Sequence, residues 1–131
     1  MMPFSKKVAL GLFTISLVSL LGCSPCSESP GARASSPDKA LSAVTTYRNC
    51  GATTSEYTRI TLTPGPGNDR DVEQLIFMAR YHQEISLQWS SPSDLTISCS
   101  TCSSKDVEFQ IVKFRSTKVA YILGPSGAGG D

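Results

Sequence analysis

The sequence predicts an all-β fold, a small antiparallel meander or sandwich of about six to seven short strands behind a signal peptide and a flexible tether. Two observations predict this fold class. Apolar and polar residues alternate with a period of two in several short stretches, which is typical of strands that bury one face. Clusters of Gly, Pro, Ser, Asn and Asp separate these stretches and indicate turns. Once residues 1–22 are removed, the 131-residue chain has room for one domain.

The first two strands are predicted soon after residue 39, where the alternation begins. Residues 41–48 alternate imperfectly, and residues 57–63 resume the pattern with Ile60 and Leu62 on one side. The stretch between these two strands reads as a loop. Residues 64–69, Pro-Gly-Pro-Gly-Asn-Asp, form a loop tip, because proline lacks a backbone donor and glycine loses much entropy on ordering.

Residues 72–80 form the one ambiguous element. Their apolar positions partly fit helical spacing, and Asp71 and Glu73 would suit the first turn of a helix. The run Leu-Ile-Phe-Met at residues 75–78 also fits a buried strand, and the β-rich neighbours favour that interpretation. We therefore predict a strand here.

The second half of the domain shows the clearest alternation. Ile85, Leu87 and Trp89 lie on one face of a predicted strand over residues 84–89. The remaining elements are predicted as a turn over 90–94, a strand over 95–99 with Leu95, Ile97 and Cys99 inward, an alternating stretch over 107–115, a turn at 116–117 and a closing strand over 118–123.

The first residues carry an export signal. Lys6 and Lys7 precede an apolar run over residues 8–21 that is too short for a permanent membrane span, which needs roughly 20 residues. The run ends in Leu20-Leu21-Gly22-Cys23, which resembles the lipobox of bacterial lipoproteins. The resemblance implies that the Cys23 thiol receives a diacylglycerol, that the chain is cut before Cys23, and that the new amino terminus is acylated. More than one acyl chain makes such an attachment stable.

The position after the lipobox bears on the destination of the protein. Ser24 stands where an aspartate would retain a lipoprotein at the inner membrane, so the resemblance implies the outer membrane, facing the periplasm, if the host is Gram-negative. Residues 24–38 are rich in Ser, Pro, Gly and Ala and read as a flexible tether. The predicted organisation is a signal peptide over 1–22, a lipid-anchored tether over 23–38, a β domain over 39–123 and a disordered tail over 124–131.

Four further cysteines remain in the exported chain. Because export leads to an oxidising compartment, we expect Cys26, Cys50, Cys99 and Cys102 to form disulfides. Cys99 could pair with Cys102 and Cys26 with Cys50, or Cys50 could bond one member of the close pair and Cys26 the other. Four cysteines allow three pairings, and the sequence does not choose among them.

The mature domain also resembles a group of small uncharacterised bacterial proteins over residues 36–122. Its landmarks are Ser-Pro-Asp at 36–38, Cys-Gly-Ala-Thr-Thr at 50–54, Trp89 before Leu-Thr-Ile at 95–97, and Val-Ala-Tyr at 119–121. The Cys-Gly-Ala-Thr-Thr loop is the specific part of this likeness. The group has no assigned activity, so the resemblance supports the domain boundary and implies no catalytic residue.

The Cys-Gly-Ala-Thr-Thr loop has two physical interpretations. Gly51 permits a positive φ at a tight corner, and Thr53 and Thr54 can bond the local backbone. Alternatively, the backbone amides of Gly51, Ala52, Thr53 and Thr54 bind an anion or a carboxylate of a partner. We favour the structural corner and keep the binding loop as the alternative.

Little else in the sequence indicates chemistry. His82, the single histidine, lies in a predicted loop without a nucleophile in a recognisable context. The pairs Asp69/Asp71 and Asp106/Glu108 lie in polar turns and strand edges. Cys99-x-x-Cys102 follows a strand, whereas redox-active pairs sit at a helix N-terminus, so a structural disulfide is favoured over thiol–disulfide exchange. A zinc site of four thiolates is a weaker alternative.

The charge excludes one class of partner. Removal of Lys6 and Lys7 reduces the 12 basic residues to 10, against 11 acidic ones. The mature chain therefore shows no excess of positive charge that would indicate a basic patch for nucleic acid. The sequence therefore predicts a lipoprotein without catalytic residues, metal or cofactor other than the lipid on Cys23. Its β domain is expected to bind another envelope component. An inhibitor or immunity-type lipoprotein and a redox protein using Cys99 and Cys102 are the alternatives.

Overall fold

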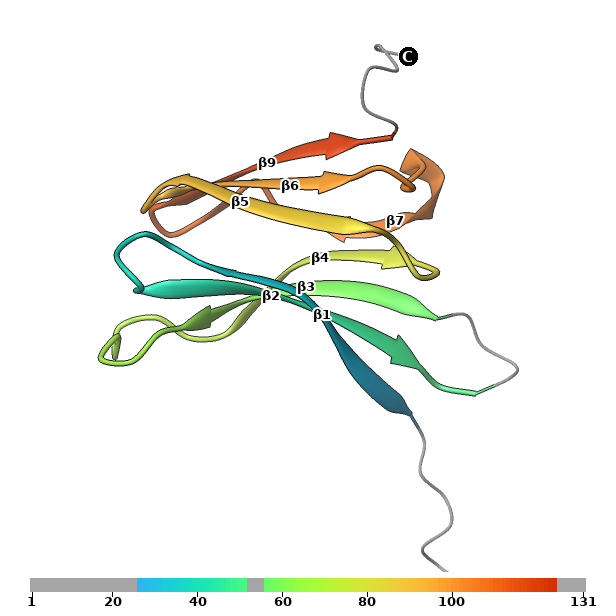
Figure 1. The fold of residues 1–131 in the computed structure, drawn as a ribbon, viewed down its shortest axis with the longest axis horizontal. Helices are drawn as coiled ribbons and strands as arrows, with labels where there is room; N and C mark the ends of the chain where they lie inside the picture. Colours follow the sequence, from blue (N-terminus) through green and yellow to red (C-terminus); the bar gives the residue numbers. More distant parts are fainter. Residues whose placement is uncertain (1–25, 52–55, 125–131) are drawn as a thin grey trace, which may run out of the picture.

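The computed structural model describes residues 26–51 and 56–124. Within them the chain forms two packed β-sheets, which confirms the all-β prediction (Figure 1). The predicted signal peptide, Cys23, Ala52, Thr53, Thr54 and the tail from residue 125 lie outside the described residues. In the part of the chain that is described, no helix is long and apolar enough to cross a membrane.

Nine strands and one short 3₁₀ turn follow one another along the described chain. They are β1 (Ser27–Ser35), β2 (Leu41–Asn49), β3 (Tyr57–Pro64), β4 (Gln74–Arg80), β5 (Ile85–Ser91), β6 (Asp94–Cys99), η2 (Ser104–Asp106), β7 (Val107–Gln110), β8 (Lys113–Phe114) and β9 (Thr117–Leu123).

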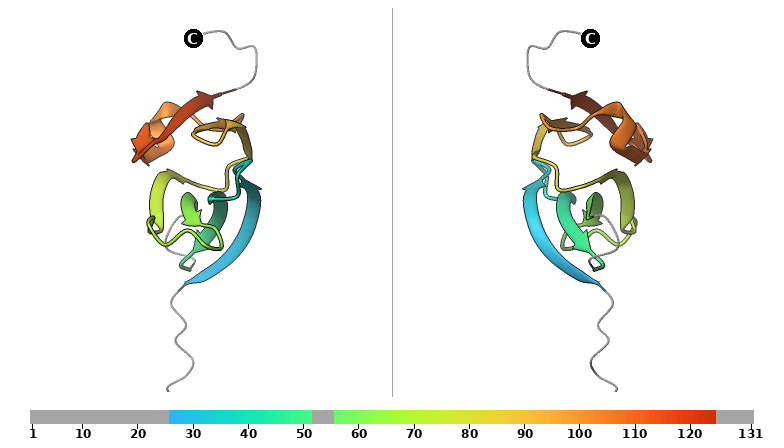
Figure 2. Two further views of the ribbon diagram at one scale, coloured as in Figure 1. Left: turned by 90° about the vertical axis from the view of Figure 1, so that its left-hand side faces the viewer. Right: turned by 90° about the vertical axis from the view of Figure 1, so that its right-hand side faces the viewer.

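The strands are divided between a five-stranded and a four-stranded sheet. The first has the order β1-β2-β3-β4-β7, and the second has the order β5-β6-β9-β8. The pattern is not a pure meander, because β6 and β9 pair in parallel with Leu95 opposite Val119. Parallel neighbours need a long crossover, and here the connection passes through β7 in the other sheet. Figure 2 shows the two sheets from both ends.

The core lies between the sheets, where the predicted inward faces meet. Ile60 and Leu62 from one sheet and Leu95 and Ile97 from the other are almost completely buried. The ambiguous segment is a strand, as predicted, and β4 contributes Phe77. The other buried members of this core are Ala43, Ile76, Ala79, Cys99, Cys102 and Val119.

Two polar side chains tie the sheets together beside the core. The Trp89 indole donates from Nε1 to the Ala34 carbonyl across 3.0 Å, which joins β5 to β1. The Tyr121 hydroxyl of β9 lies 2.6 Å from the Ile111 carbonyl and 3.0 Å from the Ile76 carbonyl. Burial raises the pKa of Tyr121 to about 12. The hydroxyl therefore stays protonated, and able to donate, up to strongly alkaline pH.

The predicted tether over 23–38 is wrong for most of its described part. Residues 27–35 form β1, an edge strand that pairs with β2 from Ser27 opposite Asn49 to Ser35 opposite Ser42. Composition concealed this strand because an edge strand buries little and tolerates Pro30, whose missing donor can face outward. A Cβ at Gly31 would lie 2.6 Å from the Tyr47 ring, so a larger residue there would force the ring to move.

The stretch predicted over 107–115 also differs from expectation. It divides into β7 in the five-stranded sheet and β8 in the four-stranded sheet. The side chain of Phe109, predicted on an alternating face, is 36% exposed. Phe109 lies opposite Met78 in the pairing of β7 with β4 and is not part of the buried core.

Candidate functional site

The four described cysteines form two disulfides, one of the pairings left open by the sequence. Cys26 bonds Cys50, and Cys99 bonds Cys102. Export chemistry predicted bridges, but only the fold could choose the partners. Within the described residues, no cluster of three or more His, Cys, Asp or Glu side chains could hold a metal ion.

The Cys26–Cys50 bridge closes the open end of the β1–β2 hairpin. Ser27 pairs with Asn49 in the sheet, so the two cysteines continue the same register by one position. The bridge fixes the start of the edge strand β1. Its first cysteine, Cys26, follows Cys23 by three residues in the sequence.

The corner after Cys50 adopts the conformation predicted from its glycine. Gly51 has a φ of 120°, and its N–H donates to the Asn49 side-chain oxygen across 3.0 Å. This supports the structural interpretation at Gly51. Ala52, Thr53 and Thr54 lie outside the described residues, so the binding-loop alternative stays a prediction.

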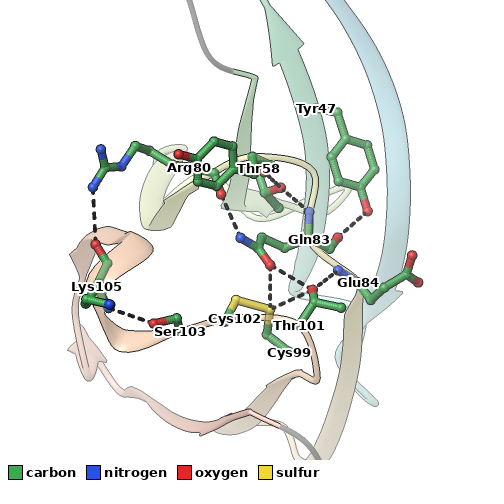
Figure 3. Close-up of a disulfide and its surroundings, with 11 residues drawn as sticks. Tyr47, Thr58, Arg80, Gln83, Glu84, Cys99, Thr101, Cys102, Ser103 and Lys105 are labelled. Atoms are coloured by element: carbon green, nitrogen blue, oxygen red, sulfur yellow. Dashed lines mark hydrogen bonds between the residues drawn. A yellow bond between two sulfur atoms is a disulfide. The ribbon is translucent and has the colours of Figure 1, made fainter.

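The Cys99–Cys102 bridge is buried beneath the connection between β4 and β5 (Figure 3). Cys99 is 0% exposed and Cys102 is 5% exposed. Cys99 ends strand β6, and the next element is the three-residue 3₁₀ turn η2 after the N-cap Ser103, so no α-helix begins beside the sulfur atoms. An attacking thiolate would have little access to this bridge.

Gln83 organises the surroundings of the buried bridge, as Figure 3 shows. It is 3% exposed, and all of its polar groups have partners. Its side-chain amide donates to the Arg80 carbonyl across 2.7 Å, and its side-chain oxygen accepts from the Thr101 hydroxyl across 2.7 Å. Its backbone N–H donates to the Thr58 hydroxyl, and its carbonyl accepts from the Tyr47 hydroxyl. A buried glutamine so completely bonded fixes the β4–β5 connection over the core.

His82 lies beside this network on the surface. Its ring stacks on Tyr47 with centroids 3.8 Å apart, and its Nδ1 lies 3.5 Å from a carboxylate oxygen of Glu56. Burial, followed by the charges of Glu84 and Glu56, raises the pKa of Tyr47. These contacts make the Tyr47–His82 pair part of the end of the sheet, and they bring no nucleophile to the imidazole.

The carboxylates considered as pairs in the sequence have separate structural partners. Asp71 lies 3.3 Å from the Arg115 guanidinium and accepts from the Asn68 amide. Glu108 lies 3.0 Å from the Arg80 guanidinium. Neither arrangement places two carboxylates together, as general acid–base chemistry would need.

The outer face of the five-stranded sheet carries side chains that the sequence reading did not single out. They point away from the core, and they combine arginines, aliphatic groups, a tyrosine and threonines. We call this surface the arginine face, and it comprises Glu28, Val44, Thr46, Arg48, Tyr57, Arg59, Thr61, Thr63, Leu75 and Met78.

Two adjoining hollows run along β3 on the arginine face. The first, of about 370 Å³, is lined mainly by threonines and carboxylates and extends from Arg59 toward Thr63 and Glu73. The second, of about 420 Å³, extends from Arg59 toward Tyr57 and Cys50 and is mainly apolar. Arg59 and Leu75 line both hollows, so the two form one groove with a polar half and an apolar half.

The groove holds two arginines, Arg48 and Arg59, and two carboxylates, Glu28 and Glu73. Glu28 of β1 lies 3.8 Å from Arg48 and 3.9 Å from Arg59, so one carboxylate serves two guanidiniums. Both separations are longer than a hydrogen bond. The Arg48 side chain is 42% exposed, although its Nε is buried and has no hydrogen-bond partner in the described chain.

The outer face of the four-stranded sheet differs in composition. Its outward positions on β5, β6 and β9 are mainly small and polar, apart from Ile122, which is 54% exposed. We call this surface the serine–threonine face, and it comprises Ser86, Gln88, Ser90, Thr96, Ser98, Lys118, Ala120 and Ile122.

The arginine face could not be assembled from the sequence, because its members come from four strands and meet only through their register. A signal was present in the outward positions of residues 57–63, which hold Tyr, Arg and two Thr. Comparison with family models, with curated proteins and with solved structures finds no match to this chain.

Proposed function

We propose that this chain is a membrane-anchored bacterial lipoprotein whose β domain, without catalytic activity, binds another component of the cell envelope through the arginine face. The anchor is the lipid predicted on Cys23. In a Gram-negative host the protein would reside at the outer membrane and face the periplasm. The partner is a protein of the envelope.

The observation that carries the binding role is the composition of the arginine face. Arginine, tyrosine, methionine and leucine project outward from β2, β3 and β4, and no lysine belongs to the set. Protein interfaces are enriched in aromatic residues, methionine and arginine and depleted in lysine. An outward sheet face that served only solubility would resemble the serine–threonine face instead.

An inhibitor or immunity-type lipoprotein would use the same surface with a secreted enzyme as its partner. The redox alternative receives less support, since burial restricts access to the Cys99–Cys102 bridge. Both kinds of partner would bind the arginine face, so the identity of the bound protein decides between an envelope component and a secreted enzyme.

A matched pair of substitutions tests the binding role. Thr61 and Thr96 both point outward from strands, Thr61 on the arginine face and Thr96 on the serine–threonine face. We expect Thr61→Arg to reduce the recovery of crosslinked partners from intact cells at least fivefold, and Thr96→Arg to leave it unchanged. Equal recovery with both variants, or no repeatable partner for the unmodified protein, would contradict the proposal.

A further inference from the structure

We propose that the apolar half of the groove on the arginine face binds a phospholipid of the membrane, with the lipid phosphate held between Arg48 and Arg59. The inference rests on the proposed anchor, which places this end of the domain at the bilayer. The polar half of the groove, which includes Thr61 and Thr63 and shares Arg59 and Leu75 with the apolar half, is left to the envelope partner.

The hollow has the size and lining of a site for an amphiphile. Its volume of about 420 Å³ lies within the roughly 300–1,000 Å³ usual for small-molecule sites. Such sites are lined mainly by apolar groups with a few polar groups that fix the orientation. The lining residues are Arg48, Cys50, Tyr57, Arg59, Leu75 and Met78.

The charges at the hollow match a phosphate diester. Arg48 and Arg59 supply two positive charges, and Glu28 supplies one negative charge at 3.8 and 3.9 Å. These three side chains together carry one positive charge in excess, which one phosphate diester neutralises, and the other carboxylate of the groove, Glu73, lines only the polar half. Planar guanidinium groups are suited to phosphate oxygens because they offer several donors in a fixed fork.

The covalent path places the hollow near the membrane. Cys50 lines it and is bonded to Cys26, which follows Cys23 by three residues. Three residues span at most about 11 Å, so the hollow lies within reach of the headgroup region. Both views show that β1 begins on the side of the five-stranded sheet turned away from the four-stranded sheet (Figures 1 and 2).

The aromatic residues at this end agree with that orientation. Tyr57 lines the hollow, and Tyr81, which is 50% exposed, follows the end of β4. In the sheet Tyr57 lies opposite Arg80, so both tyrosines belong to the end that carries the Cys26–Cys50 bridge. Tyrosine is favoured at membrane surfaces because its ring is apolar and its hydroxyl is polar.

Two other occupants fit less well. The diacylglycerol on Cys23 could fold back into the hollow, but it carries no phosphate for the two arginines. An acidic side chain of a peptide would pair with the arginines, but it carries no apolar chain for the surface of Leu75 and Met78, which line the hollow. A phospholipid supplies both the acid group and the chain.

The experiment uses the processed protein, purified from cells and placed in phosphatidylcholine vesicles that contain traces of a photoactivatable lipid. One arm uses a diazirine-bearing phosphatidylglycerol, and the other uses diacylglycerol with the same acyl chains. After trypsin cleavage, labelling is compared between the peptide over residues 71–80, which holds Leu75 and Met78, and the peptide over residues 81–105. We expect the phospholipid to label the first peptide at least fivefold more than diacylglycerol does.

Variants test the role of the arginines. Arg48→Gln with Arg59→Gln should reduce the phospholipid label to the diacylglycerol level, while Lys113→Gln with Lys118→Gln should not change it. Melting temperatures verify that both double variants fold. Equal labelling by the two lipids, no label on residues 71–80, or full label in the arginine variant would overturn the proposal.

Flotation of the same vesicles separates this inference from the anchor. If the protein floats but residues 71–80 remain unlabelled, the lipid site is wrong and the anchor stands. If the protein does not float, the anchor is wrong, and the labelling is repeated with a monomeric short-chain phosphatidylglycerol carrying the diazirine. Arginine-dependent label would then support the site, and its absence would overturn it.

Discussion

The two outer faces of the sandwich differ far more than the two inner faces do. Inward, both sheets present alternating aliphatic side chains such as Ile60 and Ile97, each completely buried. Outward, the four-stranded sheet presents Ser, Thr and Gln, whereas the five-stranded sheet presents arginines, Tyr57, Leu75 and Met78. Inward alternation is sufficient for the fold, so the outward residues are free to serve binding.

Substitutions at two neighbouring residues of β3, one inward and one outward, should differ most in their effect on the free energy of unfolding. Ile60→Ala should lower the free energy of unfolding by about 2–5 kcal/mol, because it removes a completely buried side chain. Arg59→Gln, one position away on the arginine face, should change it by less than about 0.5 kcal/mol. Urea unfolding followed by Trp89 fluorescence measures both. A large decrease in the free energy of unfolding for Arg59→Gln would show that the outer face also stabilises the fold.

Removing the Cys26–Cys50 bridge tests how firmly β1 belongs to the arginine face. Cys26→Ala with Cys50→Ala should cost roughly 3 kcal/mol, because the bridge spans 24 residues of sequence. Hydrogen exchange should accelerate in β1, which carries Glu28, more than in β6. Unchanged exchange in β1 would mean that pairing with β2 alone holds the edge strand.

The buried Cys99–Cys102 bridge should stabilise the fold less than the Cys26–Cys50 bridge does, because it closes a shorter loop, and it should show no redox turnover. Cys99→Ala with Cys102→Ala removes a bridge that spans only three residues, so the entropic loss is about 2 kcal/mol. Alkylation in intact cells should find both sulfur atoms oxidised. Recovery of a substantial alkylated fraction at these cysteines would revive the thiol–disulfide alternative.

A buried hydroxyl offers a stabilising change on the inner face. Thr45 is 0% exposed, and its hydroxyl has no hydrogen-bond partner in the described chain. Thr45→Val should therefore raise the free energy of unfolding by about 1 kcal/mol, since the unsatisfied polar group is removed and the shape is retained. Ser98→Val, on the serine–threonine face, is the control and should change stability little. A loss of stability in Thr45→Val would reveal a partner for the hydroxyl.

The smallest effect is expected for the carboxylate of the groove. Glu28 is half exposed and lies 3.8 and 3.9 Å from two guanidiniums, and exposed ion pairs contribute about 0–1 kcal/mol. Glu28→Gln should hardly change the melting temperature but should increase the arginine-dependent phospholipid label. An unchanged label would show that the carboxylate does not compete for the arginines.

The sequence predicted those parts of the fold that depend on local alternation. Ile60, Leu62, Leu95 and Ile97 face the core as expected, because a period of two reports one buried face wherever it occurs. Strand β1 lacks this signal, since its order comes from pairing with β2 and from the bridge to Cys50. An edge strand with few buried side chains lacks the apolar alternation from which a strand is predicted.

The candidate site was less predictable than the fold. Gln83 is buried because the β4–β5 connection folds over Cys99 and Thr101, and nothing in its local sequence indicates that position. Arg48 and Arg59 become neighbours only through the register of β2 with β3, and the rest of the arginine face also needs β1 and β4. Only the corner at Gly51 followed from a single residue type, since glycine alone adopts a positive φ without strain.

The proposed lipid on Cys23 would orient the arginine face, so the mass of the mature amino terminus is the decisive measurement. Protein is extracted from cells grown with labelled palmitate, and its N-terminal fragment is measured by mass spectrometry. We expect a fragment that begins at Cys23 and carries diacylglycerol and an amide-linked acyl chain, with no label in Cys23→Ser. A freely soluble product with an unmodified Cys23, or one that begins at another residue, would contradict it.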